Sequence, residues 1–302
     1  MYLDTFKLPV GKEEQIIKKR MVHNGGPYGY IDNIYPCGIF SQKQLCRIDF
    51  ERITILYGGN GSGKSTLLDL IANKLELHRT APFNSSELFS QYTYECEYTL
   101  GYDEEGSRYK VPNGSRIIKS DDVFDYMLAA RENNQDIAEN IEDAREEWGS
   151  LKFGKTVKFS GMEDYEANRL QVLARSKSLT RRQFISRTAG AEVKLNSNGE
   201  TALEYFDSKL KNDTLYCLDE PENSLSPKLQ MKLKDMIEKM SRYCGCQFIL
   251  ATHSPFLLSL SQAKIYDLDE TPVDIKKWWE LENPKIYFDF FDQYRKLFDT
   301  DA

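Results

Sequence analysis

The sequence predicts an α/β fold with a mostly parallel sheet, because strand-like and helix-like segments alternate along its last third. The apolar runs at residues 214–218, 247–251 and 265–268 have the length and composition of buried strands. Helical patterns at 228–242 and 255–260 separate them. An earlier apolar run, 53–57, leads through a glycine-rich segment into another helix. Such alternation implies parallel strands joined by right-handed crossovers.

Length and composition narrow the class of protein. A chain of 302 residues suits one large α/β domain with an insertion, or two smaller lobes. The net charge of −7 argues against indiscriminate nucleic-acid binding. We expect a soluble, cytoplasmic protein without a membrane partner, since no run of about 18 apolar residues and no signal pattern is present. The six cysteines lack the paired spacing of a zinc ribbon, so we expect reduced thiols.

The first lobe, residues 1–119, is expected to contain an antiparallel β-subdomain. Three short β-like runs occupy 37–40, 45–50 and 53–57. Residues 92–100 then alternate apolar and polar side chains, an acidic glycine turn follows at 101–106, and 108–111 resembles a return strand. This pattern predicts a β-hairpin.

A helical subdomain is predicted for residues 120–195. Apolar residues recur at helical spacing from Val123 to Leu128, and Ser120 is a candidate N-cap. The acidic stretch 131–155 is typical of a solvated helix face. A basic tract follows, and it is either another solvated face or a contact for nucleic acid or the γ-phosphate. Its members are Arg175, Lys177, Arg181, Arg182 and Arg187.

The strongest motif directly follows the apolar run 53–57 and fits the phosphate-binding pattern G-x-x-x-x-G-K-[ST]. Its glycines allow backbone N–H groups to converge on an anion at the start of a helix. Lys64 is expected to reach the β- and γ-phosphates, and Ser65 to ligate Mg²⁺. The alternative is a glycine-rich turn that only joins a strand to a helix. The loop comprises Gly58, Gly59, Asn60, Gly61, Ser62, Gly63, Lys64, Ser65 and Thr66.

Two carboxylates and a histidine follow strands of the predicted sheet. Asp219 and Glu220 directly follow the run 214–218, where an open parallel sheet places its ligands. We expect Asp219 to hold Mg²⁺ or its waters and Glu220 to orient or deprotonate the attacking water. His253 follows the next strand and is expected to act beside the γ-phosphate. Helix-capping acids and a structural histidine are the alternatives.

Together these motifs resemble the Walker A, Walker B, D-loop and H-loop of soluble AAA-family ATPases of the ABC class, in their SMC-like branch. The Walker B segment reads Asp-Glu-Pro-Glu-Asn and the H-loop Thr-His-Ser-Pro. The segment 196–200, Asn-Ser-Asn-Gly-Glu, resembles the family signature, with Ser197 and Gly199 matching its serine and second glycine. Ser197 could also be a simple N-cap. The Q-loop position, 120–122, reads Ser-Asp-Asp and lacks the glutamine.

The resemblance implies ATP and Mg²⁺ as cofactors and ATP hydrolysis as the activity. It further implies an ATP-dependent homodimer, with Ser197 and Gly199 completing the site of a second subunit, and output to an effector protein in a bacterial defence or DNA-associated system. Nucleic acid stays an open alternative partner. The competing functions are the ATP subunit of a transporter and a non-hydrolysing, nucleotide-gated scaffold.

The last lobe, residues 196–302, ends in an unusually aromatic segment at 278–291. Such a segment is expected to be either a helix docked on the ATPase core or an exposed docking patch for a partner.

Overall fold

The computed structural model describes residues 1–24, 34–80, 86–155, 165–176, 180–188 and 197–298. These fall into two compact units, which we describe separately. The first combines residues 1–124 with 202–302, and the second spans 125–201.

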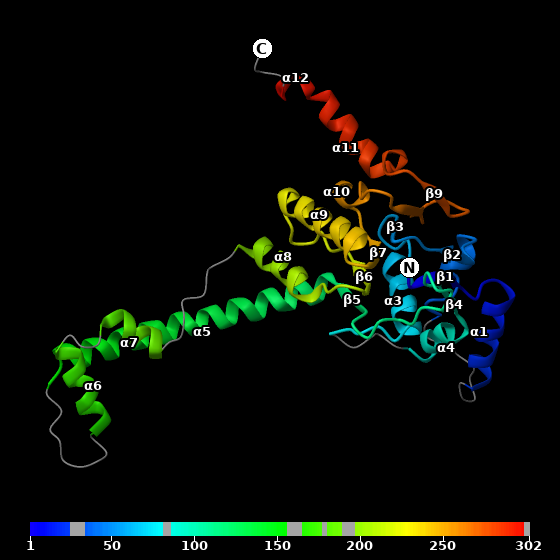
Figure 1. Ribbon diagram of the computed structural model, residues 1–302. Helices are drawn as coiled ribbons and strands as arrows, with labels where there is room; N and C mark the ends of the chain where they lie inside the picture. Colours follow the sequence, from blue (N-terminus) through cyan, green and yellow to red (C-terminus); the bar gives the residue numbers. More distant parts are fainter. Residues whose placement is uncertain (25–33, 81–85, 156–164, 177–179, 189–196, 299–302) are drawn as a thin grey trace. The chain divides into compact units, whose positions relative to one another are not determined.

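A six-stranded sheet forms the centre of the first unit (Figure 1). Its strand order is β5-β6-β7-β3-β8-β9, and every neighbouring pair is parallel except β8 with β9. The mostly parallel α/β class predicted from the alternating pattern is therefore confirmed. The strands are β3 (Ile53–Tyr57), β5 (Arg116–Lys119), β6 (Leu215–Asp219), β7 (Gln247–Ala251), β8 (Lys264–Asp267) and β9 (Asp274–Lys276).

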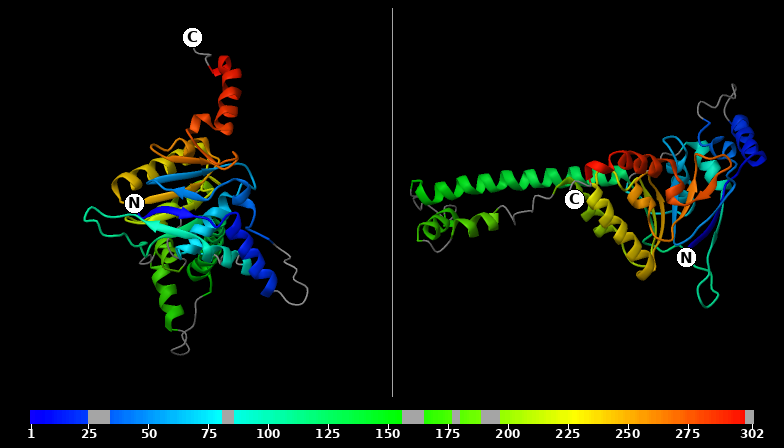
Figure 2. Two further views of the ribbon diagram at one scale, coloured as in Figure 1. Left: turned by 90° about the vertical axis from the view of Figure 1, so that its right-hand side faces the viewer. Right: turned by 90° about the horizontal axis from the view of Figure 1, so that it is seen from above.

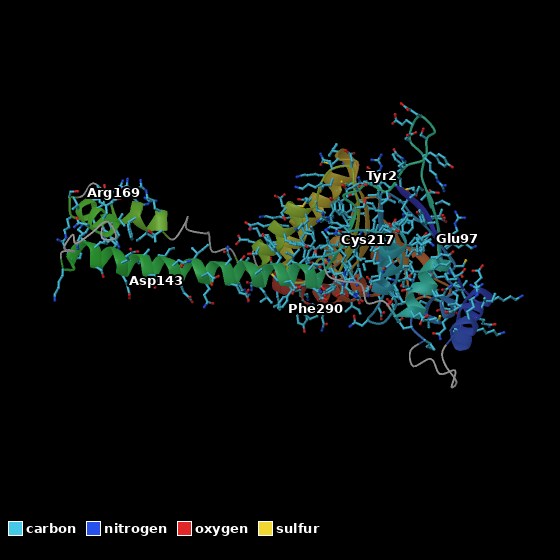
Figure 3. All side chains as sticks on the ribbon, turned by 90° about the horizontal axis from the view of Figure 1, so that it is seen from below. Tyr2, Glu97, Asp143, Arg169, Cys217 and Phe290 are labelled. Atoms are coloured by element: carbon cyan, nitrogen blue, oxygen red, sulfur yellow. The ribbon has the colours of Figure 1, made fainter. Side chains whose placement is uncertain are left out.

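The second sheet is antiparallel, also as predicted, and its order is β2-β1-β4. Its strands are β1 (Leu3–Lys7), β2 (Arg47–Asp49) and β4 (Glu97–Leu100). Helix α3 (Lys64–Lys74) joins the two sheets into one core, because its buried leucines pack with Phe6 of β1 and with Leu215 and Cys217 of β6. Cys217 lies deep among the strands in Figure 3.

Figures 1 and 2 show the remaining helices of the first unit. Helix α9 (Pro227–Tyr243) begins with Pro at its first turn, where proline's missing N–H costs nothing, and buries Leu233 and Ile237. The others are α1 (Lys12–Asn24), α2 (Ile39–Gln42), α4 (Glu87–Glu95), α10 (Pro255–Leu258), the 3₁₀ helix η2 (Trp278–Glu280), α11 (Glu282–Gln293) and α12 (Arg295–Phe298). Helix α8 (Asn198–Lys209) begins in the second unit.

The second unit is helical. It contains most of α5 (Ser120–Phe153) together with α6 (Tyr165–Arg175) and α7 (Arg181–Thr188). Helices α6 and α7 lie along the C-terminal part of α5 (Figure 2). Trp148 of α5 packs there against Phe184 of α7, with ring centroids 5.6 Å apart, and Ala174 of α6 completes this small core.

Two stretches of the first lobe that were predicted as strands form a turn or a helix instead. Residues 37–40 form a turn and the start of α2, and the run predicted from Tyr92 is helical until Glu95. Helix α4 forms because the Ser86 side chain accepts a hydrogen bond from the Phe89 N–H and because Leu88, Phe89 and Tyr92 share a buried face. Burial on one helical face therefore outweighed the period-two alternation.

The predicted hairpin is much smaller than expected. A single bridge, Tyr102 with Arg108, replaces the return strand at 108–111, and β4 pairs with β1 instead. Ser120 is not an N-cap but the first helical residue of α5, and the Asp122 carboxylate accepts the N–H of Lys119 at that helix start. Strands β1 and β9 were not predicted, because strands of only five and three residues have little periodicity to detect.

The aromatic C-terminal segment is not docked on the core. Leu281 and Pro284 are buried, and the Asn283 N–H donates to Tyr57 Oη at 3.1 Å, but residues 285–298 are exposed. Phe290, labelled in Figure 3, has 55% of its surface accessible. Packing is thus limited to the start of α11.

Candidate functional site

The carboxyl ends of the parallel strands bring the predicted site residues of the first unit together. The register places Lys119 beside Asp219, Asp219 beside Ala251, and Ala251 beside Leu56. The phosphate loop, the two carboxylates and His253 each begin where one of these strands ends, so they share one edge of the sheet.

The loop at 58–63 has the backbone geometry that the motif requires. Gly58 and Gly63 have φ of 152° and 97°, in the region that favours glycine. A Cβ at Gly58 would lie 2.7 Å from Ser62 Oγ, and one at Gly63 would lie 2.9 Å from Ile39 Cγ2. A side chain at either glycine would therefore clash with these neighbouring atoms.

Helix α3 begins directly after Gly63, and its first N–H bond to a loop carbonyl runs from Leu67 to Gly63 at 2.9 Å. The preceding amides of the first turn point toward the loop, as in helix N-terminal anion sites. The loop and the start of α3 line a hollow of about 300 Å³, together with Tyr35, Ile39 and Glu220.

Lys64 is buried at the base of this loop. Its ammonium donates to Gly58 O at 2.7 Å and to Gly59 O at 3.0 Å. Burial lowers the pKa of Lys64 from its usual value, while the charges of Glu220 and Asp219 act in the opposite direction. The lysine ammonium therefore binds neutral carbonyl oxygens, which are weaker acceptors than charged groups, and it lies close to the carboxylates of Glu220 and Asp219.

Ser65 and Asp219 meet across the site, since Ser65 Oγ donates to Asp219 Oδ1 at 2.9 Å. Burial raises the pKa of Asp219, which Lys119 and the Ser65 hydroxyl partly offset. One hydroxyl and one carboxylate oxygen are hard ligands of the kind that Mg²⁺ prefers when phosphates complete its shell. These residues therefore fit the cation that the motifs imply. The described residues contain no group of three or more His, Cys, Asp or Glu side chains arranged to bind a metal.

Glu220 lies in a strained turn directly after β6. Its φ of 48° falls in the left-handed region, which costs a non-glycine residue about 1 kcal/mol or more. Its N–H donates to Ala251 O at 2.8 Å, and its Oε2 accepts from Asn223 Nδ2 at 3.0 Å. Strain of this kind persists where the surrounding structure over-determines the backbone, and it is frequent at functional sites.

His253 faces Glu220, with His253 Nε2 3.7 Å from Glu220 Oε1. Within the described part of the chain, this buried Nε2 has no hydrogen-bond partner. Burial lowers the pKa of His253, and the nearby Lys64 charge lowers it further. A neutral imidazole nitrogen is therefore available at the site.

A glutamate that the sequence analysis did not single out holds the histidine loop. Glu222 Oε1 accepts three hydrogen bonds, from Thr252 Oγ1 at 2.7 Å and from the N–H groups of His253 at 2.7 Å and Ser254 at 3.1 Å. Burial raises the pKa of Glu222, and these donors oppose that shift. Its place in the Asp-Glu-Pro-Glu-Asn segment was the signal that could have identified it.

Three further residues of the site also escaped the sequence analysis. Asp269 Oδ2 accepts the Gly59 N–H at 2.7 Å and fixes the start of the phosphate loop. Tyr35 Oη donates to Thr66 Oγ1 at 2.9 Å. Lys119 lies 3.8 Å from Asp219 Oδ2. Tyr35 and Asp269 belong to no recognisable motif, and only the fold brings them to the loop.

The signature-like segment belongs to the second unit, so its position relative to the phosphate loop is not described. Ser197 and Glu200 form a capping box at the start of α8: Ser197 N–H and Oγ donate to Glu200 Oε2 at 3.0 and 2.9 Å, and Glu200 N–H donates back to Ser197 Oγ at 3.4 Å. The alternative of a simple N-cap therefore describes the geometry of Ser197. Gly199 lies in the first turn of the same helix, and Asn196 lies outside the described residues.

The basic tract is divided between elements. Arg175 of α6 donates to Gly154 O at 2.7 Å. Arg181, Arg182 and Arg187 of α7 are exposed, and Lys177 lies outside the described residues.

Comparison with protein families identifies the domain. Residues 53–259, more than half of the chain, match the model of a family described as "AAA domain, putative AbiEii toxin, Type IV TA system". The chain belongs to this family. The match extends from β3 to the residue after α10, so it contains the phosphate loop, Asp219, Glu220 and His253. A comparison with curated proteins finds no significant match.

A comparison with solved structures matches ATP-binding cassettes and SMC heads. One is a dimeric ATP-binding cassette in a post-hydrolysis state bound to ADP and phosphate, at 16% identity and a TM-score of 0.34, covering 77% of this chain and 90% of that one. The SMC head domain of Thermotoga maritima shares 16% identity, with a TM-score of 0.33 and coverage of 76% and 92%. The Pyrococcus furiosus Smc head bound to the C-terminal domain of ScpA shares 13%, with a TM-score of 0.36 and coverage of 82% and 95%.

Proposed function

We propose that this AAA-domain protein binds ATP with Mg²⁺ at the carboxyl edge of its parallel sheet and hydrolyses the γ-phosphate. The observation that carries the proposal is the 2.9 Å contact between Ser65 Oγ and Asp219 Oδ1. These residues are 154 positions apart in the sequence. Ser65 is the last position of the phosphate-binding pattern, and Asp219 is the last residue of strand β6. A glycine turn without function would need neither this contact nor a buried lysine beside it.

In this mechanism the chain binds the triphosphate mainly through its backbone. The amides of the loop and of the first turn of α3 receive the phosphate oxygens. Lys64 exchanges its bonds to the carbonyls of Gly58 and Gly59 for the stronger, charge-assisted bonds to the β- and γ-phosphates. Ser65 and Asp219 would hold Mg²⁺, which neutralises charge on the phosphate oxygens when bound.

Glu220 and His253 act on the far side of the γ-phosphate. The strained turn aims Glu220 at the space beside His253, where the carboxylate orients a water and accepts its proton. His253, neutral at physiological pH because its pKa is lowered, can donate or accept one hydrogen bond through Nε2 and so position either the water or the phosphate. Glu222 keeps the histidine loop in place by binding its backbone N–H groups.

The output that we propose is an ATP-dependent homodimer that regulates an effector protein. Ser197 and Gly199 open α8, and a helix start of this kind can bind the γ-phosphate held by a second subunit. The family description names a toxin of a type IV toxin–antitoxin system, which supports a bacterial defence role. The alternative of a transporter subunit predicts co-purification with a membrane protein. Among the described residues, no helix combines the length and apolar character needed to cross a membrane.

The test is Glu220→Gln, with Glu104→Gln in the exposed turn as the matched control. Removing the base should slow phosphate release by about a hundredfold and leave ATP affinity unchanged. Light scattering with ATP and Mg²⁺ should then show a trapped dimer for Glu220→Gln. Hydrolysis equal in both variants would refute the catalytic assignment, and a monomer with full ATP occupancy would refute homodimerisation. Wild-type protein that binds ATP without releasing phosphate would favour the scaffold.

A further inference from the structure

Asp219 has a different neighbour on each of its two carboxylate oxygens. Oδ1 accepts from Ser65 Oγ at 2.9 Å, and Oδ2 lies 3.8 Å from the ammonium of Lys119. Lys119 is the last residue of β5 and pairs in register with Asp219 on β6. A cation of the chain itself therefore lies against the carboxylate that the proposed function assigns to Mg²⁺.

Lys119 is shared with a second carboxylate. Its Nζ lies 2.7 Å from Asp69 Oδ2, on α3 one turn after Ser65. The three side chains are mostly buried, with 13% of Lys119, 19% of Asp69 and 9% of Asp219 accessible. Asp69 Oδ1 is also buried, and no described residue hydrogen-bonds to it. Charges this poorly solvated influence one another strongly.

The position of Lys119 matters because it immediately precedes Ser120, the segment where the resembled ATPases carry a glutamine. An amide oxygen can ligate a divalent cation, whereas an ammonium has no lone pair and repels one. Lys119 is therefore chemically opposite to the glutamine amide that the resembled ATPases carry in the segment after it. It cannot ligate the metal, and it acts on the metal through its charge and through its contact with Asp219.

We propose that Lys119 is a positioning residue that weakens and tunes divalent-cation binding by sharing Asp219 with the metal. The Asp69 carboxylate partly offsets the positive charge of Lys119. This inference rests on the proposed metal site at Ser65 and Asp219. It predicts effects of opposite sign at the two partners of one ion pair. Removing the lysine strengthens metal binding, because Asp219 loses a competitor and Asp69 becomes an unpaired negative charge nearby. Neutralising Asp69 weakens metal binding, because the charge of Lys119 is then no longer offset and Lys119 competes more strongly for Asp219.

The experiment is a Mn²⁺ titration followed by electron paramagnetic resonance, in the presence of a non-hydrolysable ATP analogue. Lys119→Met should lower the Kd for Mn²⁺ by about tenfold or more, the size expected when a unit charge beside a divalent ion is removed even at the dielectric of water. Asp69→Asn should raise the Kd by about threefold or more. Lys119→Arg is the matched control and should stay within about twofold, since the charge is retained. Analogue affinity in EDTA should be unchanged in Lys119→Met.

Asp219→Asn separates the inference from the function on which it rests. If this variant binds Mn²⁺ as tightly as wild type, the metal site itself is misassigned and both proposals fail. If Asp219→Asn loses Mn²⁺ but Lys119→Met and Asp69→Asn both weaken binding, the ion pair is merely structural and this inference alone is overturned. Weaker analogue binding by Lys119→Met in EDTA would make Lys119 a phosphate ligand and overturn it too. Should Lys119→Met not fold, Lys119→Leu carries the same test, because it also removes the charge without adding an oxygen ligand.

Discussion

Glu222 provides the most direct test of how the histidine loop is held. The substitution Glu222→Ala removes one oxygen that accepts three hydrogen bonds, from Thr252 Oγ1 and from the N–H groups of His253 and Ser254. A donor left without a partner costs about 1–3 kcal/mol when buried, and less where water can enter the vacated space. We therefore expect a loss of about 3 kcal/mol in the free energy of unfolding.

This loss corresponds to a fall of about 6–12 °C in the melting temperature, at about 2–4 °C per kcal/mol for a domain of 150–250 residues. Thermal unfolding followed by circular dichroism measures it. The rate of single-turnover ATP hydrolysis should fall as well, because the backbone of His253 loses its anchor. Glu222→Gln retains an acceptor oxygen and should recover at least half of the lost stability.

Glu238→Ala is the matched control, since Glu238 accepts two hydrogen bonds from Ser261 at a solvent-exposed position. Water replaces exposed acceptors at little cost, so its melting temperature should change by no more than about 2 °C. The reasoning would be refuted if Glu222→Ala melted within 2 °C of wild type and hydrolysed ATP at the same rate.

Three other predictions concern the loop, the histidine and the C-terminal helix. Lys64→Ala should abolish ATP binding in calorimetric titration while preserving the fold, and unchanged affinity would contradict the loop assignment. Because the native pKa of His253 lies below its usual 6.5, its contribution to stability is present above pH 6.5 and lost as the pH falls through 6.5 toward the native value. Wild type should thus lose melting temperature relative to His253→Gln between pH 7.5 and 5.5, and a constant difference would show that His253 does not titrate this way. Deleting residues from Ile286 onward should change the melting temperature by no more than about 2 °C, since these side chains are exposed, whereas a large loss would show that α11 packs on the core.

Much of the sheet and its motifs could be predicted from the chain alone because the relevant signals are local. A strand buried on both faces is a short, continuous apolar run, and 53–57, 214–218 and 247–251 match β3, β6 and β7 to within one residue. The glycines of the phosphate loop are dictated by backbone conformation at their own positions, so they are visible without knowledge of the rest of the fold.

Local patterns were insufficient where another element decided the outcome. Residues 92–95 alternate like a strand but are helical because Tyr92 and Phe89 fill the core beside α3. The aromatic residues of α11 could equally have been core or surface, since hydrophobicity alone does not say whether a packing surface is within reach.

For this protein, the sequence by itself identified the candidate residues for phosphate binding and acid–base chemistry and the strands that hold them. Only the tertiary structure decided how their charges are arranged. Lys119, Asp69 and Asp219 lie far apart in the chain, and their contact depends on the register of β5 with β6 and on the packing of α3 against the sheet. Electrostatic interaction depends on distance through space and on burial, neither of which is encoded in any short segment.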